Sequence, residues 1–110
     1  MRSDEERLRD ILQSIAAIEK YTKRGHSFFY KNELVQSWVM RHLEIIGEAA
    51  TQASEGLREK TPEIPWRNII GMRNILAHGY FEIDTDTVWK VVENDLTPLR
   101  KSVKKILKDG

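Results

Sequence analysis

The chain has no cysteine among its 110 residues, which excludes a disulfide framework and a thiolate metal site. It has only three prolines and six glycines, so few positions force a break in regular structure. Its apolar runs are too short to span a bilayer, and the charged start from Met1 to Arg7 is unlike a signal peptide. We therefore expect a soluble cytoplasmic protein with no membrane association.

The chain also has no excess of charge of one sign, because its 18 Lys and Arg residues nearly balance its 17 Asp and Glu residues. The whole molecule is thus expected to exert no general attraction on nucleic acid. Any contact with RNA or DNA would have to come from a local patch. The length suits one compact core, so we predict a single domain over residues 1–110.

Runs of alternating strand residues are absent as well, and apolar residues recur at helical spacing. Ser3 and Glu6 form a capping-box pattern at the start of a first helix, which Gly25 would end. A second helix is expected to begin between residues 27 and 32 and to end near residue 53, with Gly56 as its terminator.

Two further helices are expected after Pro65 and from residue 84 or 85. Pro98 should kink or break the last one near Asp95. The connectors are short, so the pattern predicts an all-α antiparallel bundle of four helices, or five if the last divides.

The stretch from Arg73 to Tyr80 stands out chemically. It reads R-x4-H-x-Y, and residues 66–80 carry Arg67, Arg73 and His78 but no Asp or Glu. A fixed cation beside a titratable imidazole suits a phosphate ester better than a protein core.

Arg73 and His78 are five residues apart, about 140° around an ideal helix, so they do not share one face. They converge if the helix ends near His78, which Gly79 would allow, or if two copies of the motif meet across a dimer axis. The spacing fits both arrangements.

Each motif residue also has a purely structural reading. Arg73 alone would be an ordinary surface cation, His78 a helix C-terminal cap, and Tyr80 a packing ring. Trp38, Trp66 and Trp89 are most simply aromatic residues of the core or of a dimer interface. The three histidines have no metal-ligand spacing, so the sequence predicts neither a metal site nor a cofactor.

Five blocks of sequence resemble the HepT-like family of the HEPN superfamily, in the same order and spacing. They are Leu43 to Ala50 (LEIIGEAA), Pro62 to Arg67 (PEIPWR), Gly71 to Asn74 (GMRN), His78 to Phe81 (HGYF), and Val88-Trp89. The likeness covers nearly the whole chain. It gives the R-x4-H pair a specificity that the pair alone would lack.

The resemblance implies a dimeric helical bundle whose two R-x4-H motifs share one cleft and cleave RNA without a metal. It also implies the toxin of a HepT/MntA-type (type VII-like) toxin–antitoxin pair, whose partner is a minimal nucleotidyltransferase that adds AMP to the motif tyrosine. On this reading Arg73 and His78 are catalytic, Asn74 and Arg67 support RNA binding, and Tyr80 is the AMPylation site.

Two alternatives stay open at the sequence level. In one, the same cleft binds RNA or a nucleotide without cutting it, and the protein is an accessory subunit and substrate of the nucleotidyltransferase. In the other, the chain is a dimerising bundle without a ligand.

Overall fold

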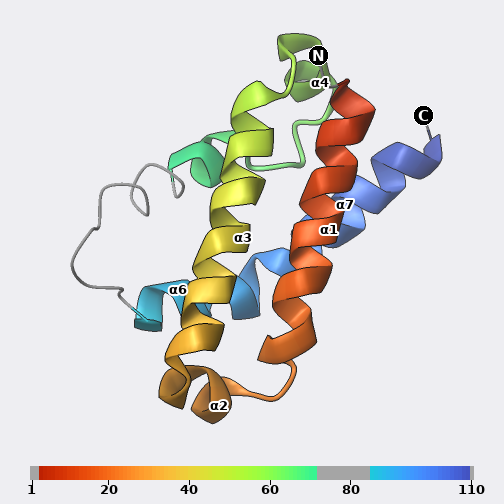
Figure 1. The fold of residues 1–110 in the computed structure, drawn as a ribbon. Helices are drawn as coiled ribbons and strands as arrows, with labels where there is room; N and C mark the ends of the chain where they lie inside the picture. The colour runs from red at the N-terminus through yellow and green to blue at the C-terminus, as the bar shows by residue number, and fades with distance from the viewer. Residues whose placement is uncertain (1–2, 72–84, 110) are drawn as a thin grey trace.

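The computed structural model describes residues 3–71 and 85–109, and these residues are helical apart from short connections (Figure 1). Over this part of the chain the all-α prediction is confirmed. The labelled helices are α1 (Asp4–Thr22), α2 (His26–Lys31), α3 (Glu33–Gln52), α4 (Glu55–Lys60), α6 (Thr85–Asn94) and α7 (Leu96–Asp109). Residues 66–71 are helical as well. Dimerisation stays a prediction.

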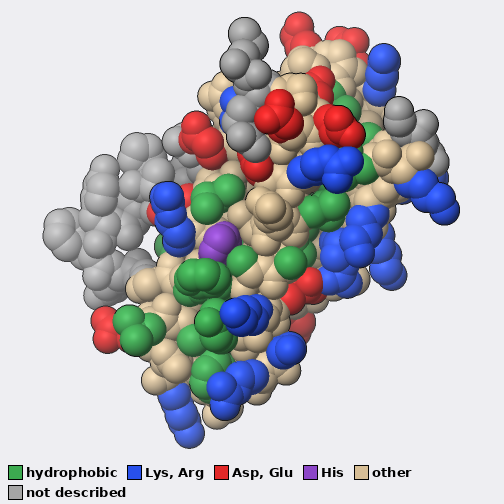
Figure 2. Space-filling view, turned by 45° about the vertical axis from the view of Figure 1, so that its right-hand side comes forward, with side chains coloured by type: hydrophobic (Ala, Val, Ile, Leu, Met, Phe, Trp, Pro, Cys, Tyr) green, Lys and Arg blue, Asp and Glu red, His purple; other side chains and the backbone are tan. Residues whose placement is uncertain are grey.

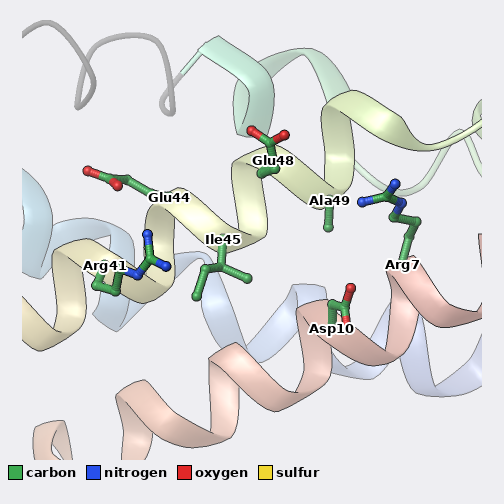
Figure 3. A pocket seen from close by; sticks show the side chains of 7 residues that line it. All are labelled: Arg7, Asp10, Arg41, Glu44, Ile45, Glu48 and Ala49. Carbon is green, nitrogen blue, oxygen red and sulfur yellow. The ribbon is translucent and has the colours of Figure 1, made fainter. Parts of the chain in front are cut away.

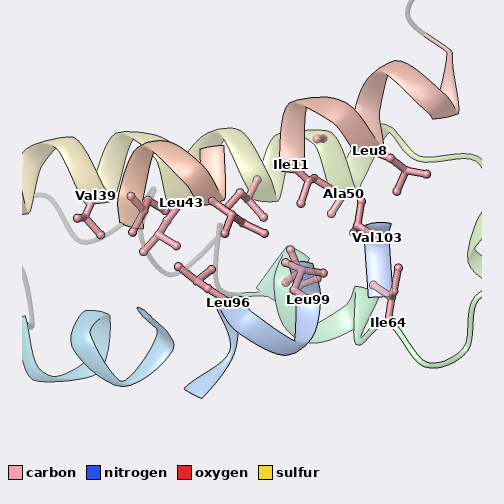
Figure 4. Close-up of a cluster of buried hydrophobic side chains, with 14 of the residues drawn as sticks. Leu8, Ile11, Val39, Leu43, Ala50, Ile64, Leu96, Leu99 and Val103 are labelled. Carbon is pink, nitrogen blue, oxygen red and sulfur yellow. The ribbon is translucent and has the colours of Figure 1, made fainter. Parts of the chain in front are cut away.

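The long helices α1 and α3 run antiparallel and form the main contact of the fold, and α7 packs against α1 (Figure 1). Their facing sides, with α7, bury a continuous apolar core (Figure 4). The largest fully buried side chains come from α1, α2, α3 and α7: Ile11, Ile15, Ile18, Phe29, Val39, Leu43, Ile46 and Val103. Burial of such side chains is the dominant stabilising term of a bundle.

The predicted start and end of α1 are confirmed, and so is the predicted break in the last helix, whose start at residue 84 or 85 lies at the edge of the described residues. The Ser3 hydroxyl accepts from the Glu6 amide at 3.2 Å, and the Glu6 carboxylate accepts from the Ser3 amide at 3.1 Å. Gly25 follows α1 with a φ of 101°, a conformation that suits glycine. The chain leaves helical geometry at Asp95, as expected from the missing N–H of Pro98.

The second long helix, α3, ends at Gln52 as predicted and begins at Glu33, just after the predicted range. The short helices on either side of it, α2 and α4, were not predicted. Gly56, expected to terminate the second long helix, lies inside α4. The Ser54 hydroxyl caps α4 by accepting from the Leu57 amide at 3.1 Å, and Phe29 anchors α2 in the core. Helices of six residues are too short to show a 3.6-residue period, which explains the error.

No helix in the described ranges is long and apolar enough to cross a membrane.

Candidate functional site

The sequence-predicted motif lies almost entirely outside the described residues. Arg73, Asn74, His78 and Tyr80 fall within residues 72–84, so their proposed convergence stays a prediction. Arg67 is the one predicted site residue that the structure places. It is exposed on the helical turn of residues 66–71, which leads directly into the motif.

A buried hydroxyl anchors the start of that turn. The Thr61 Oγ1 accepts from the Trp66 indole Nε1 at 3.0 Å and donates to the Leu57 carbonyl at 2.7 Å. Trp66 and Ile69 are both only 7% exposed, so they point into the core, whereas Arg67 points to solvent. Trp66 is thus a core residue, as one sequence reading held, and its anchoring fixes which face of the turn carries Arg67.

An apolar hollow of about 470 Å³ opens beside Arg67. It lies between α3, the turn of residues 66–71, α6 and α7. Its lining residues are Leu43, Ile46, Pro65, Arg67, Asn68, Ile69, Gly71, Thr87, Val88, Val91, Asp95, Leu96 and Leu99. Arg67 and Asn68 add polar groups to the apolar lining, on the side where the chain enters the motif.

A second hollow, of about 480 Å³, is charged and lies on the seam between α1 and α3 (Figure 3). Arg7 and Asp10 project from α1, while the other lining residues, Arg41, Glu44, Ile45, Glu48 and Ala49, come from α3. Three carboxylates and two guanidinium groups give this hollow a mixed charge.

This charged hollow was not predicted from the sequence. Arg41, Glu44 and Glu48 follow one another at three- and four-residue steps, so a charged stripe on α3 could have been recognised. Its meeting with Arg7 and Asp10 depends on the antiparallel register of α1 against α3, which helical periodicity does not specify.

Further along the same seam, His42 sits beside an aromatic pair. Its Nδ1 lies 3.2 Å from the Ser14 hydroxyl, and its ring centroid lies 4.6 Å from that of Trp38. Burial, reinforced by the positive charge of Arg41, holds the pKa of His42 below its usual 6.5. The imidazole is therefore neutral at pH 7.

Within the described ranges, no group of three or more His, Asp or Glu side chains is arranged to hold a metal ion. The motif histidine lies outside those ranges, so the expected metal-free chemistry is untested.

Comparisons with known proteins give one consistent result. The family model "Ribonuclease HepT-like" matches residues 11–106. A protein of Methanocaldococcus jannaschii named "Putative RNase MJ1380" is 41% identical over 97 residues, covering 87% of this chain and 89% of that protein. The "Probable ribonuclease HepT" of Thermococcus cleftensis is 37% identical over 108 residues, covering 97% and 98%.

A bacterial relative, "Putative RNase TTE0752" of Caldanaerobacter subterraneus, is 37% identical over 102 residues, covering 91% of this chain and 90% of its own. No solved structure matches the chain.

Proposed function

Because the chain belongs to the ribonuclease HepT-like family, we propose that it is a metal-independent endoribonuclease whose catalytic pair is Arg73 and His78. The observation that carries this proposal is the match over residues 11–106, which includes the whole R-x4-H-x-Y motif. Relatives that align over about nine-tenths of their length are named as RNases.

The reaction that suits this pair is internal transesterification. His78 removes the proton from a ribose 2′-OH, and the oxygen attacks the adjacent phosphorus. The bond from phosphorus to the 5′-oxygen breaks, and that oxygen takes up a proton. The products are a 2′,3′-cyclic phosphate and a 5′-hydroxyl, with no change of oxidation state.

Arg73 would stabilise the charge that builds on the non-bridging phosphate oxygens, because its guanidinium presents several donors to them. The second proton transfer falls to the His78 of another copy, if two motifs share a cleft. Asn74 would orient one of these groups by hydrogen bonding, and exposed Arg67 would bind a neighbouring phosphate on the approach to the motif.

We further propose that the protein is a toxin controlled by a minimal nucleotidyltransferase that transfers AMP to Tyr80. Tyr80 is two residues from His78. An AMP phosphate there would occupy a basic site meant for the substrate phosphate and would block RNA entry. Mass spectrometry after incubation with the transferase and ATP tests this, with Tyr80→Phe as the control. AMP on Tyr30, which is 55% exposed, instead of Tyr80 would contradict it.

RNA cleavage in EDTA tests the catalytic proposal. His78→Ala and Arg73→Ala should each lower the rate by roughly 10²-fold or more, and products should carry 2′,3′-cyclic phosphate ends. His26→Ala and Arg9→Ala are matched controls, because both residues are exposed outside the motif. RNA binding without cleavage in the unmodified protein would favour the non-catalytic accessory subunit. Full activity in both motif variants would refute the catalytic pair.

A further inference from the structure

Three aromatic rings form a ladder along the seam between α1 and α3, away from the R-x4-H motif in sequence. The Trp38 ring makes an edge contact with Tyr21, with centroids 5.7 Å apart, and a second one with His42 at 4.6 Å. The Trp38 indole Nε1 donates to the Ala17 carbonyl at 2.8 Å, which fixes the ring across the seam. Trp38 nevertheless stays 39% exposed.

A cation stands at each end of this ladder. The Lys20 ammonium lies 5.6 Å from the centroid of the Tyr21 ring, and Arg41 directly precedes His42 on α3. Both cations are exposed. We call Lys20, Tyr21, Trp38, Arg41 and His42 the aromatic–basic strip.

The strip lies at the basic end of a molecule with almost no net charge. From Lys20 to Arg41 the chain carries five Lys or Arg residues and a single Glu. The space-filling view shows Lys and Arg beside hydrophobic side chains in its lower half and further Lys and Arg along its right edge, whereas most of the Asp and Glu lie in its upper part (Figure 2). RNA binding by a near-neutral chain requires such a local excess of basic side chains.

We propose that the aromatic–basic strip is an RNA-binding surface, on which single-stranded RNA stacks a base against Trp38 while Lys20 and Arg41 contact its phosphates. The inference rests on the proposed ribonuclease function and adds a binding site outside the motif. Exposed aromatic rings between cations are the usual means of holding single strands without sequence preference.

Charge favours RNA over a second copy of the chain as the occupant. Two copies docked strip on strip about a two-fold axis would bring the same cations face to face, which is unfavourable. A polyanion neutralises these cations and releases counterions.

The test measures binding of a labelled 2′-O-methyl RNA of about 12 nucleotides, which the 2′-OH reaction cannot cleave, by fluorescence anisotropy at several salt concentrations. The double variant Lys20→Gln/Arg41→Gln should bind the RNA at least tenfold more weakly. The slope of the logarithm of the binding constant against the logarithm of the salt concentration should become less steep by about 1.4, or 0.7 for each lost phosphate contact. Lys101→Gln with Lys104→Gln makes the same charge change on exposed positions of α7, and it should bind like the unmodified protein.

Stacking is tested separately at Trp38. Trp38→Leu should weaken binding roughly 5- to 100-fold, whereas Trp38→Phe, which loses the same indole hydrogen bond but keeps a ring, should retain most of it. Circular dichroism confirms that each variant is folded.

The outcomes separate the two proposals. If the unmodified protein cleaves RNA but the strip variants bind RNA as it does, the strip inference is overturned and the ribonuclease function stands. If the unmodified protein neither binds nor cleaves RNA, the proposed function fails and the inference fails with it. If the strip variants and Leu34→Ala lose self-association in sedimentation while RNA binding persists, the surface is a protein interface and the inference is wrong.

Discussion

The imidazole of His42, which packs between α1 and α3, makes the folding stability depend on pH. Its ring lies between Ser14 and Trp38, and burial together with Arg41 depresses its pKa. An unfolded chain protonates this histidine near pH 6.5, whereas the folded chain does so only at lower pH. Below about pH 6.5 the unfolded state therefore binds more protons, and folding stability is lost as pH falls.

The corresponding prediction is that His42→Gln makes stability less dependent on pH. Urea unfolding at about pH 7.5 and 5.5 should show a smaller loss of unfolding free energy in the variant than in the unmodified protein. Ser14→Ala is the control, because it removes a hydrogen-bond partner but leaves the ionisable ring buried. An equal loss in the unmodified protein and His42→Gln would contradict the assignment.

A second residue-scale prediction concerns Thr61, which is 4% exposed and joins two polar groups. Thr61→Val leaves the Trp66 indole N–H without its acceptor, so we expect a loss of about 1–3 kcal/mol in unfolding free energy. Thr22→Val is a matched control, because the Thr22 hydroxyl only donates to the Ile18 carbonyl of its own helix. Its loss should be the smaller of the two in urea unfolding. Equal losses would show that the indole does not depend on Thr61.

At the scale of the elements, Arg58 joins α4 to the end of α3. Its Nη2 donates to the carbonyls of Ala50 at 2.9 Å and Thr51 at 2.8 Å in the last turn of α3, where the Ala50 carbonyl also accepts from the Ala53 amide at 3.3 Å. A cation there also suits the negative end of the helix dipole.

Arg58→Ala should lower the unfolding free energy by about 1–3 kcal/mol, because charged hydrogen bonds to two terminal carbonyls are lost. Arg58→Lys should recover part of this, since it keeps the charge without the planar fork. Guanidinium-induced unfolding measures both. A fully stable Arg58→Ala would mean that α4 is held by its apolar contacts alone.

How far the sequence predicts the elements depends on their length. The helices α1 and α3 are long enough to show a period and carry recognisable start signals, Ser3 with Glu6 and the Asn32 cap. The break at Asp95 was predictable from Pro98, because the proline itself lacks the backbone N–H that a continuous helix needs. The short helix α4 contacts α3 through Arg58, whose hydrogen bonds to the Ala50 and Thr51 carbonyls cannot be read from helical periodicity.

Part of the candidate site could likewise be predicted from the sequence, and part could not. The R-x4-H-x-Y motif is contiguous, so the sequence alone identifies Arg73 and His78. The aromatic–basic strip joins Tyr21 of α1 to Trp38 of α3, and it exists only once the antiparallel register is known. Trp38 was expected to be a core or interface residue, and its 39% exposure is what permits the RNA-binding interpretation.

At the scale of the whole molecule, charge is separated along the long helices although the net charge is close to zero. Residues 3–10 carry four acids and two arginines, and residues 42–59 carry four acids and one arginine. Both stretches lie at the end of the α1/α3 pair opposite the basic end, because the helices are antiparallel (Figure 1). RNA that approached from solution would thus be oriented toward the strip, and this steering should weaken with added salt.

The proposed composite cleft gives the last prediction. If Arg73 of one copy works with His78 of the other, then Arg73→Ala and His78→Ala proteins should complement each other. Each variant alone lacks one member of every pair, but a mixed dimer contains one cross-axis pair with both members intact. Co-refolding the two variants should give RNA cleavage above the sum of their separate rates, and adding inert protein in place of one variant should not. If co-refolding yields mixed dimers with no added activity, one cross-axis pair is not sufficient: either each motif works within its own chain, or the reaction needs the His78 of both copies.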